Sequence, residues 1–583
     1  MRRLVPISLI ALALSACQSQ QPSAPVAASP SSTGAAASAA SAPAPAASVA
    51  PPRVALAPQI NAPDFLAFDQ ALSSDAFGGR KPGSAGETLT TTYLVDQFKR
   101  MGLEPGNRGS WFQSVPVVST NLTNTGVKLD VREGGGTQTF AYGDEMIVGT
   151  LQDRPKVTLR NSPIVFVGYG IDAPQWQWND YQGVDVRGKT VIVLVNDPGY
   201  ATGDPQLFRG RAMTWYGRWV YKYEEAARQG AAACFIVHTT GAAGYPWTVV
   251  KNSWSGPQQS LPPSVAPGPR LAVAGWLTHD AAARLFARAG LDLDTLAKQA
   301  ARRGFRPVPL KATASITLDS AISRTRSNNV LAMVKGSKYP DQVVVYSAHW
   351  DHLGTVIGPD GKKEIFHGAI DNGSGLSALL EIADAFAHAK TPPQRSVLFF
   401  MPTLEEAGLL GSQYYVAHPA FALDKTVADI NVDAWPIIGR AHDMTVIGYG
   451  QSQLEDDLKS VLAAQHRVIT PEATPENGFY FRSDHFNFAK AGVPALIASS
   501  GLDLLEGGRA AGLAAAADYT AHRYHTPNDV FDPHWNLDGT LEDIQTLYLL
   551  GRDLADGGQW PGWYPDSEFR ARREAMMSKA AGK

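Results

Sequence analysis

A run of apolar residues that ends in two adjacent glutamates sets the strongest constraint on how this chain can fold. The stretch is LFFMPTLEEAGLLGS, residues 398–412, and its first half has the composition of a strand in the middle of a buried sheet. Carboxylates rarely lie beside a core unless they are paired or bind a metal ion. One of Glu405 and Glu406 must nevertheless point inward, because adjacent side chains point in different directions in a helix and in a strand.

The composition is that of an ordinary globular protein with room for two or three domains. The chain has 583 residues, of which 44% are hydrophobic and 18% are charged. Its formal net charge of -3 gives no electrostatic argument for binding nucleic acid. The two cysteines, Cys17 and Cys234, offer neither a CxxC zinc site nor a disulfide framework.

The N-terminus predicts export and attachment to a membrane. A positive MRR segment is followed by a short apolar run, which is typical of a secretory signal rather than a membrane span. The residues LSAC that end at Cys17 resemble the lipobox of bacterial lipoproteins. We therefore expect a signal peptide over residues 1–16 and a lipid anchor on Cys17, in the outer membrane facing the periplasm or at the cell surface. The alternative is an ordinary signal peptide with an incidental cysteine.

Residues 17–58 are rich in Ala, Pro and Ser, and such a segment cannot nucleate a core, so we expect a tether there. The catalytic domain is predicted over residues 59–156 and 311–565, followed by a C-terminal tail over residues 566–583. From about residue 327, apolar strands alternate with amphipathic helices. This pattern predicts an α/β fold with a mostly parallel central sheet and helices on both of its faces.

The intervening segment, residues 157–310, has a different texture. Short strand-like runs such as PIVFVGYGI, KTVIVLVND and AACFIVHTT are separated by turn residues, which predicts a mainly-β insert. The order of these motifs resembles a protease-associated (PA) domain, a non-catalytic module of secreted peptidases. A plain accessory β-domain is the alternative, and it makes the same prediction that the insert carries no catalytic groups.

Histidines and carboxylates follow the predicted strands of the α/β part. Ligand sites in such sheets form at the carboxyl ends of strands, where we expect these side chains to meet. Taken singly, a helix cap, a turn or a surface histidine would explain each of them. Two histidines and three carboxylates together fit two divalent metal ions with one shared ligand, and imidazole with carboxylate suits zinc. The candidates in these segments are His349, Asp351, His352, Asp371, Glu405, Glu406, Asp433, His525 and Asp529.

Six motifs in order, SAHWDHLG, HGAIDNGSG, PTLEEAGLLGS, NVDAW, RSDHFNF and YHTPND, resemble the co-catalytic zinc exopeptidases that include bacterial leucyl aminopeptidases. Glutamate carboxypeptidase II-like enzymes, glutaminyl cyclases and the non-catalytic transferrin receptor share that zinc exopeptidase fold. The resemblance implies two Zn²⁺ ions per chain, with other divalent metals as alternatives. It assigns His349, Asp371 and Asp433 to one metal ion and Glu406, His525 and Asp371 to the other, so that Asp371 bridges the two.

The resemblance also implies roles for three further residues. Asp351 would orient the ring of His349, and Glu405 would be the general base. Tyr480 is a candidate oxyanion donor, with an aromatic pocket wall as the alternative. We expect His352, His367 and His485 to be hydrogen-bonding loop residues rather than ligands, and the long segments 354–368 and 495–525 to be loops that line the cleft.

The sequence therefore predicts a zinc-dependent exopeptidase that removes N-terminal residues from peptides, using a water activated by two metal ions. A carboxypeptidase or dipeptidase on the same metal site is the nearest alternative, because the sequence does not tell whether the cleft neutralises an amine or a carboxylate. A binding protein with an inactive peptidase domain would have lost ligands, and here each expected ligand is present. A glutaminyl cyclase is disfavoured by the insert. The oligomeric state is left open.

Overall fold

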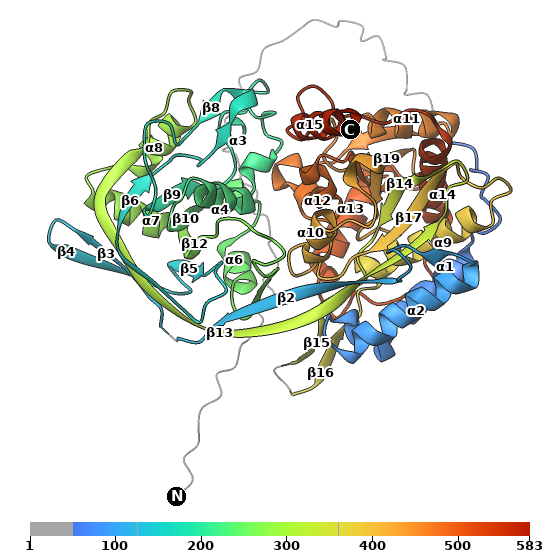
Figure 1. The fold of residues 1–583 in the computed structure, drawn as a ribbon, viewed down its shortest axis with the longest axis horizontal. Helices are drawn as coiled ribbons and strands as arrows, with labels where there is room; N and C mark the ends of the chain where they lie inside the picture. Colours follow the sequence, from blue (N-terminus) through green and yellow to red (C-terminus); the bar gives the residue numbers. More distant parts are fainter. Residues whose placement is uncertain (1–49, 125, 359–360, 583) are drawn as a thin grey trace, which may run out of the picture.

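The chain folds into two lobes, each built around its own sheet (Figure 1). The computed structural model describes residues 50–124, 126–358 and 361–582. The predicted signal peptide, Cys17 and most of the predicted tether lie outside the described residues. No helix within the described ranges combines the length and the apolar character of a membrane span.

The larger lobe contains the predicted α/β sheet. Its central strands β17, β14, β18 and β21 run parallel to one another, as continuous apolar runs predict. At one edge β13 pairs antiparallel with β17, and at the other β19 pairs antiparallel with β21 and parallel with β20. The strands are β13 (Val308–Val334), β14 (Tyr339–Ser347), β17 (Arg395–Met401), β18 (Thr426–Asn431), β19 (Asp443–Val446), β20 (Val468–Pro471) and β21 (Ala495–Ser500).

Helices cover both faces of this sheet, as predicted. Alternate residues of β14 enter two separate cores: Val344 packs in the core that includes α1, α2, α9 and α14, whereas Val345 packs in the core that includes α10 and α12. All seven residues of β17 are buried for the same reason. The helices are α1 (Ala62–Leu72), α2 (Ala85–Met101), α9 (Gly375–Ala387), α10 (Leu410–Ala417), α11 (Leu454–Ala464), α12 (His485–Ala491) and α14 (Asp538–Asp556).

The smaller lobe contains the strands expected of the insert, β6 (Lys156–Phe166), β9 (Thr190–Leu194), β10 (Ala233–His238) and β12 (Val273–Thr278). These four strands run parallel in that order, and helices α4 (Trp219–Arg228), α7 (His279–Arg288) and α8 (Leu293–Ala300) accompany them. The same sheet also takes in β3 (Lys128–Glu133), β4 (Gly136–Ala141) and β5 (Met146–Gly149), which the sequence analysis placed in the catalytic domain. Their assignment depends on pairing with β13 and β12, distant partners that local sequence does not reveal.

One strand joins the two lobes. The 27 residues of β13 pair first with β6 in the smaller lobe, then with β2 (Phe112–Leu122), and finally with β17 in the larger lobe. Figure 1 shows β13 and β2 as a curved ribbon that runs beneath both lobes. Because backbone pairing is continuous along this ribbon, the lobes are connected by hydrogen-bonded structure and not only by loops.

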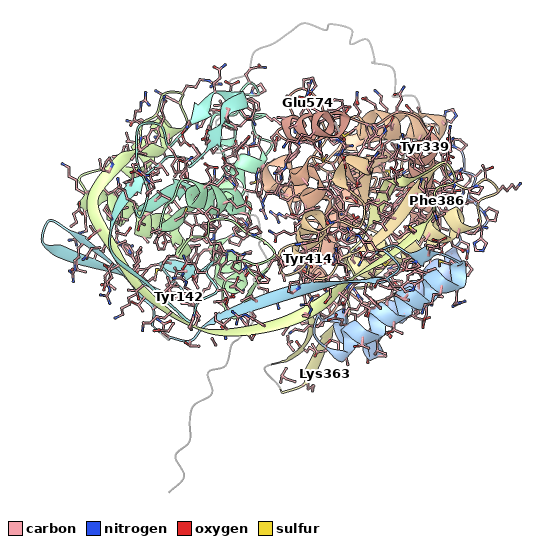
Figure 2. All side chains as sticks on the ribbon, in the orientation of Figure 1. Tyr142, Tyr339, Lys363, Phe386, Tyr414 and Glu574 are labelled. Carbon is pink, nitrogen blue, oxygen red and sulfur yellow. The ribbon has the colours of Figure 1, made fainter. Side chains whose placement is uncertain are left out.

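Three segments differ from their predicted form. Residues 495–525, expected as a loop, contain helix α13 (Gly508–His522), whose alanines favour helix strongly. Residues 354–368 form a hairpin of β15 (Gly354–Ile357) and β16 (Lys363–Phe366), and Figure 2 shows Lys363 near its tip, away from both lobes. The expected C-terminal tail contains helix α15 (Arg570–Ala581), which is docked because the buried Arg573 donates hydrogen bonds to two backbone carbonyls, those of Leu423 and Thr426.

Candidate metal centre

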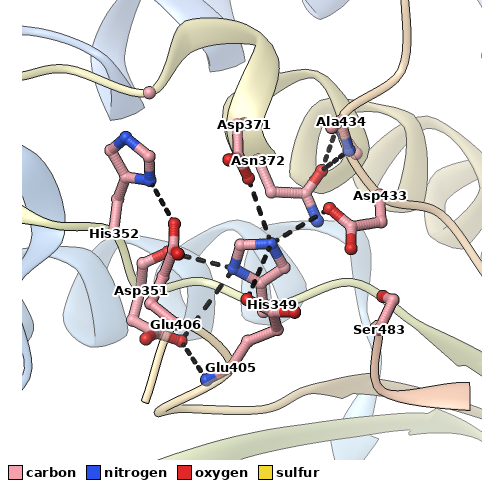
Figure 3. A network of polar contacts seen from close by, with 12 residues as sticks. His349, Asp351, His352, Asp371, Asn372, Glu405, Glu406, Asp433, Ala434 and Ser483 are labelled. Atoms are coloured by element: carbon pink, nitrogen blue, oxygen red, sulfur yellow. Dashed lines mark hydrogen bonds and ion pairs between the residues drawn. The ribbon is translucent and has the colours of Figure 1, made fainter. Parts of the chain in front are cut away.

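The five predicted ligands meet at one edge of the larger sheet. Figure 3 labels His349, Asp371, Glu406 and Asp433 among them. The three parallel strands β14, β17 and β18 end side by side, and His349, Glu406 and Asp433 follow within a few residues of their ends. Asp371 comes from the turn that leads into α9, and His525 from the segment after α13. Parallel pairing therefore brings together residues that lie far apart in the sequence.

Asp371 lies between the two histidines. Its Oδ1 is 3.3 Å from Nε2 of His349, and its Oδ2 is 3.0 Å from Nε2 of His525. Each histidine has a second carboxylate beside the same nitrogen. Asp433 Oδ1 is 3.1 Å from His349 Nε2, and Glu406 Oε2 is 3.2 Å from His525 Nε2. The cluster thus consists of two nitrogen–carboxylate groups that share Asp371.

These distances fit the shell of a metal ion. Zinc binds His nitrogen and carboxylate oxygen at about 2.0–2.2 Å, so two ligand atoms in a tetrahedral shell lie roughly 3.3–3.5 Å apart. The nitrogen–oxygen separations here are 3.0–3.3 Å. In addition, Nε2 of His525 is buried and makes no hydrogen bond, although two carboxylate oxygens face it. A nitrogen that faces oxygens without hydrogen-bond geometry has the arrangement of a ligand beside another ligand.

The charge balance of the cluster calls for cations. Burial lowers the pKa of His349, but the charges of Asp433 and Glu405 outweigh burial and raise this pKa well above its usual value. Burial is likewise outweighed at His525, where Glu406 and Asp371 raise the pKa to about 11. The carboxylates therefore favour positive charge at both imidazoles. Divalent metal ions between these groups would supply it and leave the imidazoles neutral.

Glu405 and Glu406 have different surroundings. Glu406 Oε1 is 2.7 Å from His352 Nδ1, and its Oε2 faces His525, so these contacts outweigh burial and lower the pKa of Glu406 to about 2. The carboxylate of Glu405 lies farther out, 4.0 Å from Nε2 of His349, and burial raises its pKa well above the usual value. The carboxylate of Glu406 therefore contacts two imidazoles closely, whereas that of Glu405 lies beside the cluster at a longer distance from His349.

Asp351 contacts His349 differently from what was expected. Its backbone carbonyl lies 3.0 Å from Nδ1 of His349, whereas its carboxylate lies 3.9 Å away. The carboxylate instead accepts a hydrogen bond of 3.1 Å from the backbone N–H of Glu405. Asp351 thus contacts both the histidine and the loop of the paired glutamates. The carbonyl, rather than the carboxylate, is the nearer partner of the imidazole.

Tyr480 is not part of the cluster. Its side chain is 3% exposed, packs edge-on against His485 and is stacked on Phe569. Its hydroxyl donates to the backbone carbonyl of Ala495, at 3.5 Å. Tyr480 is therefore a core residue, and the geometry does not support its expected role as an oxyanion donor. From sequence alone, an amphipathic tyrosine near a motif fits a pocket wall as well as the hydrophobic core. In the structure its packing contacts place it in the core.

Several residues that sequence analysis did not assign to the site position its ligands. His352, expected as a simple loop residue, contacts Glu406 and forms with Glu406 and Asp371 a group whose ligand atoms lie within 4.8 Å of one another. Asn372 holds the loop of Asp433, because its side chain donates to Val432 O and accepts from the N–H of Ala434. The carboxylate of Asp529 accepts hydrogen bonds from the backbone N–H groups of Ile370 and Asp371, each 3.0 Å long.

Arg80 connects two ligand-bearing loops from beneath the site. It is completely buried, and its guanidinium donates to the backbone carbonyls of Trp350, Leu72, His367 and Gly368 at 2.7–3.0 Å. Trp350 immediately follows His349, and Gly368 lies in the loop that leads to Asp371. A planar group with several donors suits this task, because one side chain satisfies carbonyls from both loops. Nothing in the local sequence GGRKPG distinguishes this arginine from a surface one.

Residues 329–549 match the sequence profile of peptidase family M28. This range contains the five predicted ligands as well as Glu405, so fold and site agree with the match. The match covers residues 329–549 only, and the rest of the chain lies on either side of it.

Similarity to individual proteins is partial. The chain is 31% identical to "Aminopeptidase NAALADL1" of Mus musculus over 138 residues, which are 22% of this chain and 17% of that protein. It is 32% identical to "Leupeptin-inactivating enzyme 1" of Streptomyces exfoliatus over 165 residues, or 28% of this chain and 34% of that one. The chain thus spans well under half of these relatives. A solved aminopeptidase from Aneurinibacillus sp. strain AM-1 superposes with a TM-score of 0.44 at 20% identity, covering 86% of this chain and 95% of that one.

Replacing Arg80 by Met should weaken metal binding. The substitution leaves four buried carbonyls without their donor, so the loops of His349 and Asp371 lose their common support. Partners that orient metal ligands are typically worth about 10- to 100-fold in metal affinity. We expect a loss of that order in zinc affinity, measured by competition with a chromogenic chelator. The zinc affinity of Arg80→Lys should lie between those of the wild type and Arg80→Met. Lysine keeps the positive charge but lacks the planar guanidinium that donates to several carbonyls at once.

Arg100→Met serves as the control, because Arg100 lies on α2 and its guanidinium bonds only the Gln97 side chain among the described contacts. It should bind zinc like the wild type. A folded Arg80→Met protein with unchanged zinc affinity would show that the loops hold their ligands without this residue.

Proposed function

We propose that this chain is a zinc-dependent exopeptidase that removes N-terminal residues from peptides. The observation that carries the proposal is the placement of Asp371, whose two oxygens face different histidines, each with its own second carboxylate. This is the arrangement needed to hold two metal ions with one shared ligand. An inactive binding protein of this fold would not need all five groups in place.

His349, Asp371 and Asp433 would hold one Zn²⁺ ion, and Glu406, His525 and Asp371 the other, with His352 as a further neighbour of the second ion. Bound at these residues, divalent ions would supply Lewis-acid chemistry, which polarises a carbonyl and lowers the pKa of water from about 15.7 towards about 7. The residues around them do the rest. Asp371 fixes the spacing of the two groups, and Asp351 joins the loop of His349 to that of Glu405.

Glu405 is the proposed general base. Its carboxylate lies beside the cluster, 4.0 Å from Nε2 of His349, where it can take a proton from the attacking water. The same carboxylic acid can then deliver this proton to the nitrogen of the departing amine. Glu405 therefore moves one proton from water to leaving group within a single turnover, while Glu406 stays in place.

Removal from the N-terminus is favoured over removal from the C-terminus by two considerations. The relatives include "Aminopeptidase NAALADL1", and the cluster itself is rich in carboxylates that attract a free amine. A carboxypeptidase or dipeptidase on the same centre is the alternative. It differs in whether the terminal amine of the substrate is required.

The direct test compares free and N-acetylated peptides with and without a chelator. We expect cleavage of leucyl peptides with a free amine, loss of that activity with 1,10-phenanthroline and its return with added Zn²⁺. The N-acetylated peptides should be poor substrates. Rapid cleavage of the N-acetylated peptides alone would reverse the assignment to a carboxypeptidase, and activity that survives complete removal of metal would reject the metal centre.

The two adjacent glutamates should respond differently to the same change. Glu405→Gln keeps the shape but removes the base, so bound zinc should remain while turnover falls by about 10²–10⁴-fold or more. Glu406→Gln removes a contact to His525, so one metal ion should dissociate readily and activity should recover partly with excess Zn²⁺. Bound metal and turnover are measured side by side. Loss of a metal ion from Glu405→Gln, with both retained in Glu406→Gln, would exchange the two roles.

We further propose that residues 157–310 act as a protease-associated domain, which shapes access to the site without supplying metal ligands. The four parallel strands of the insert and its contacts with the segment around residues 475–482 support this role.

Attachment to a membrane through Cys17 is also a proposal, based on the LSAC motif and the tether after it. Cys17→Ser should prevent lipidation, so the protein should appear in the soluble fraction or remain unprocessed. The wild type should require detergent for extraction, and its acyl chain should label with radioactive palmitate. A wild-type mature protein that is wholly soluble and unlabelled would contradict the proposal.

A further inference from the structure

A buried asparagine of β13 contacts both ends of the loop that carries the paired glutamates. This glutamate loop, residues 403–411, leaves β17 and returns to the start of α10. Its two ends, Thr403 and Gly411, form a neck, because the N–H of Gly411 donates to Thr403 O at 3.0 Å. Asn329 is completely buried against this neck. The backbone around Glu405 and Glu406 is therefore closed at its base by one side chain from another strand.

Pro402 explains why a side chain is needed at this point. The antiparallel pairing of β13 with β17 ends at Met401, and Pro402 has no N–H with which to continue the ladder. The amide of Asn329 bonds the next residues instead, since Oδ1 accepts from Thr403 N at 3.0 Å and Nδ2 donates to Gly411 O at 3.0 Å. One amide thus satisfies a donor on one side of the neck and an acceptor on the other.

The amide of Asn329 is itself held in one orientation. Gln113, its cross-strand partner on β2, accepts from Asn329 Nδ2 at 3.0 Å and donates to His418 O at 2.7 Å. Space at the neck is also limited, since a Cβ added to Gly411 would lie 2.5 Å from Asn329 Oδ1 and closer still to Thr403 O. The neck therefore has a closed arrangement that an added methyl group would open.

The position of Glu405 depends on this neck more than that of Glu406 does. The carboxylate of Glu406 contacts Nδ1 of His352 at 2.7 Å. That of Glu405 lies at a longer distance, 4.0 Å from Nε2 of His349. The backbone before Glu405 is also strained, because Leu404 has a positive φ of 59° that surrounding contacts must maintain. Opening the neck would let Leu404 relax and would move the Glu405 carboxylate relative to the metal ligands.

We propose that Asn329 is a positioning residue for peptide hydrolysis, which keeps the glutamate loop closed and so sets the place of the Glu405 carboxylate. The inference rests on the proposed function, in which Glu405 is the general base. Among the described residues, the side chain of Asn329 bonds Gln113 and the two ends of the loop, and no metal ligand. A displacement of about 1 Å can cost on the order of 10²-fold in rate, so Asn329 affects turnover through the loop while metal and substrate stay bound.

Asn329→Leu nearly keeps the volume of the side chain but removes both of its hydrogen bonds at the neck. In the zinc-loaded, full-length enzyme, kcat for leucyl peptides should fall by about 10- to 100-fold, while KM and bound zinc stay close to those of the wild type. A folded Asn329→Leu protein with the kcat of the wild type overturns the proposal. A loss confined to KM or to zinc content overturns it as well.

Asn328→Leu is the matched control. Asn328 is the preceding residue of the same strand, and its side chain donates to Glu87 on the other face at 3.3 Å. The same substitution there leaves the neck intact, so kcat, KM and bound zinc should match those of the wild type. An equal fall in kcat in both variants would trace the effect to the strand as a whole and overturn the role of the Asn329 amide.

Gly411→Ala opens the same neck from the other side and keeps the proposal testable if Asn329→Leu does not fold. The added methyl group meets Asn329 Oδ1 and Thr403 O, so the two ends of the loop must separate. We expect the same pattern, a lower kcat with zinc retained. A Gly411→Ala enzyme with the full kcat of the wild type would show that the neck does not determine the position of the base, contrary to the proposal.

A double variant shows whether Asn329 acts through the base. In the Glu405→Gln background, Asn329→Leu should cause no further loss of kcat, because the group that Asn329 positions has already been removed. The same fold-loss in both backgrounds would indicate a general structural role and would overturn the proposal.

Hydrogen exchange separates this inference from the proposed function, because it requires no turnover. Peptides that span residues 403–411 should exchange faster in zinc-loaded Asn329→Leu protein than in the wild type or in Asn328→Leu, and peptides from α9 should not change. Faster exchange in a protein that cleaves no peptide supports the contact of Asn329 with the loop and rejects the proposed function alone. Unchanged exchange of the loop overturns the inference, even if the wild type is an active aminopeptidase.

Discussion

The repulsion among carboxylates at one edge of a sheet is the constraint on which the rest of this structure depends. Asp371, Glu405, Glu406 and Asp433 are brought within a few ångströms of two imidazoles. No folded arrangement keeps these charges together without cations among them and rigid loops behind them. The parallel strands bring these residues together, because the carboxyl ends of the strands lie at one edge of the sheet. The buried Arg80 supplies both a positive charge and a common anchor for two of the loops.

The loops at the site depend on backbone positions that ordinary side chains adopt reluctantly. Leu404, Ala434 and His525 all have positive φ, of 59°, 45° and 56°, and each is a ligand or the neighbour of a site residue. Such conformations cost on the order of 1 kcal/mol or more each and persist only where surrounding contacts determine them. At Ala434 the side chain of Asn372 provides such a contact, because it accepts from the N–H of Ala434 and donates to Val432 O.

The sequence predicted what local patterns encode, and the remainder depends on contacts between distant segments. The strands around His349, Glu406 and Asp433 were predictable because buried parallel strands are continuous apolar runs and polar residues follow them. Tyr480 was misplaced because an amphipathic ring suits both a pocket wall and a core. The role of Arg80 could not be predicted, since the carbonyls of Trp350, His367 and Gly368 that it binds lie more than two hundred residues away along the chain. Residues 508–522 were read as a loop, although their alanines already favoured a helix.

The long strand β13 gives the two lobes a fixed relationship that a flexible linker could not provide. It pairs in turn with β6 in the insert, with β2 and with β17 in the catalytic sheet, and the Glu405–Glu406 loop follows β17 within a few residues. The same chain segment thus sets the position of the insert and supports the sheet that ends at the metal centre. The insert is therefore held at a defined place relative to the catalytic sheet. Substrate preference could then change through the insert while the charges at the sheet edge, which tolerate little change, stay as they are.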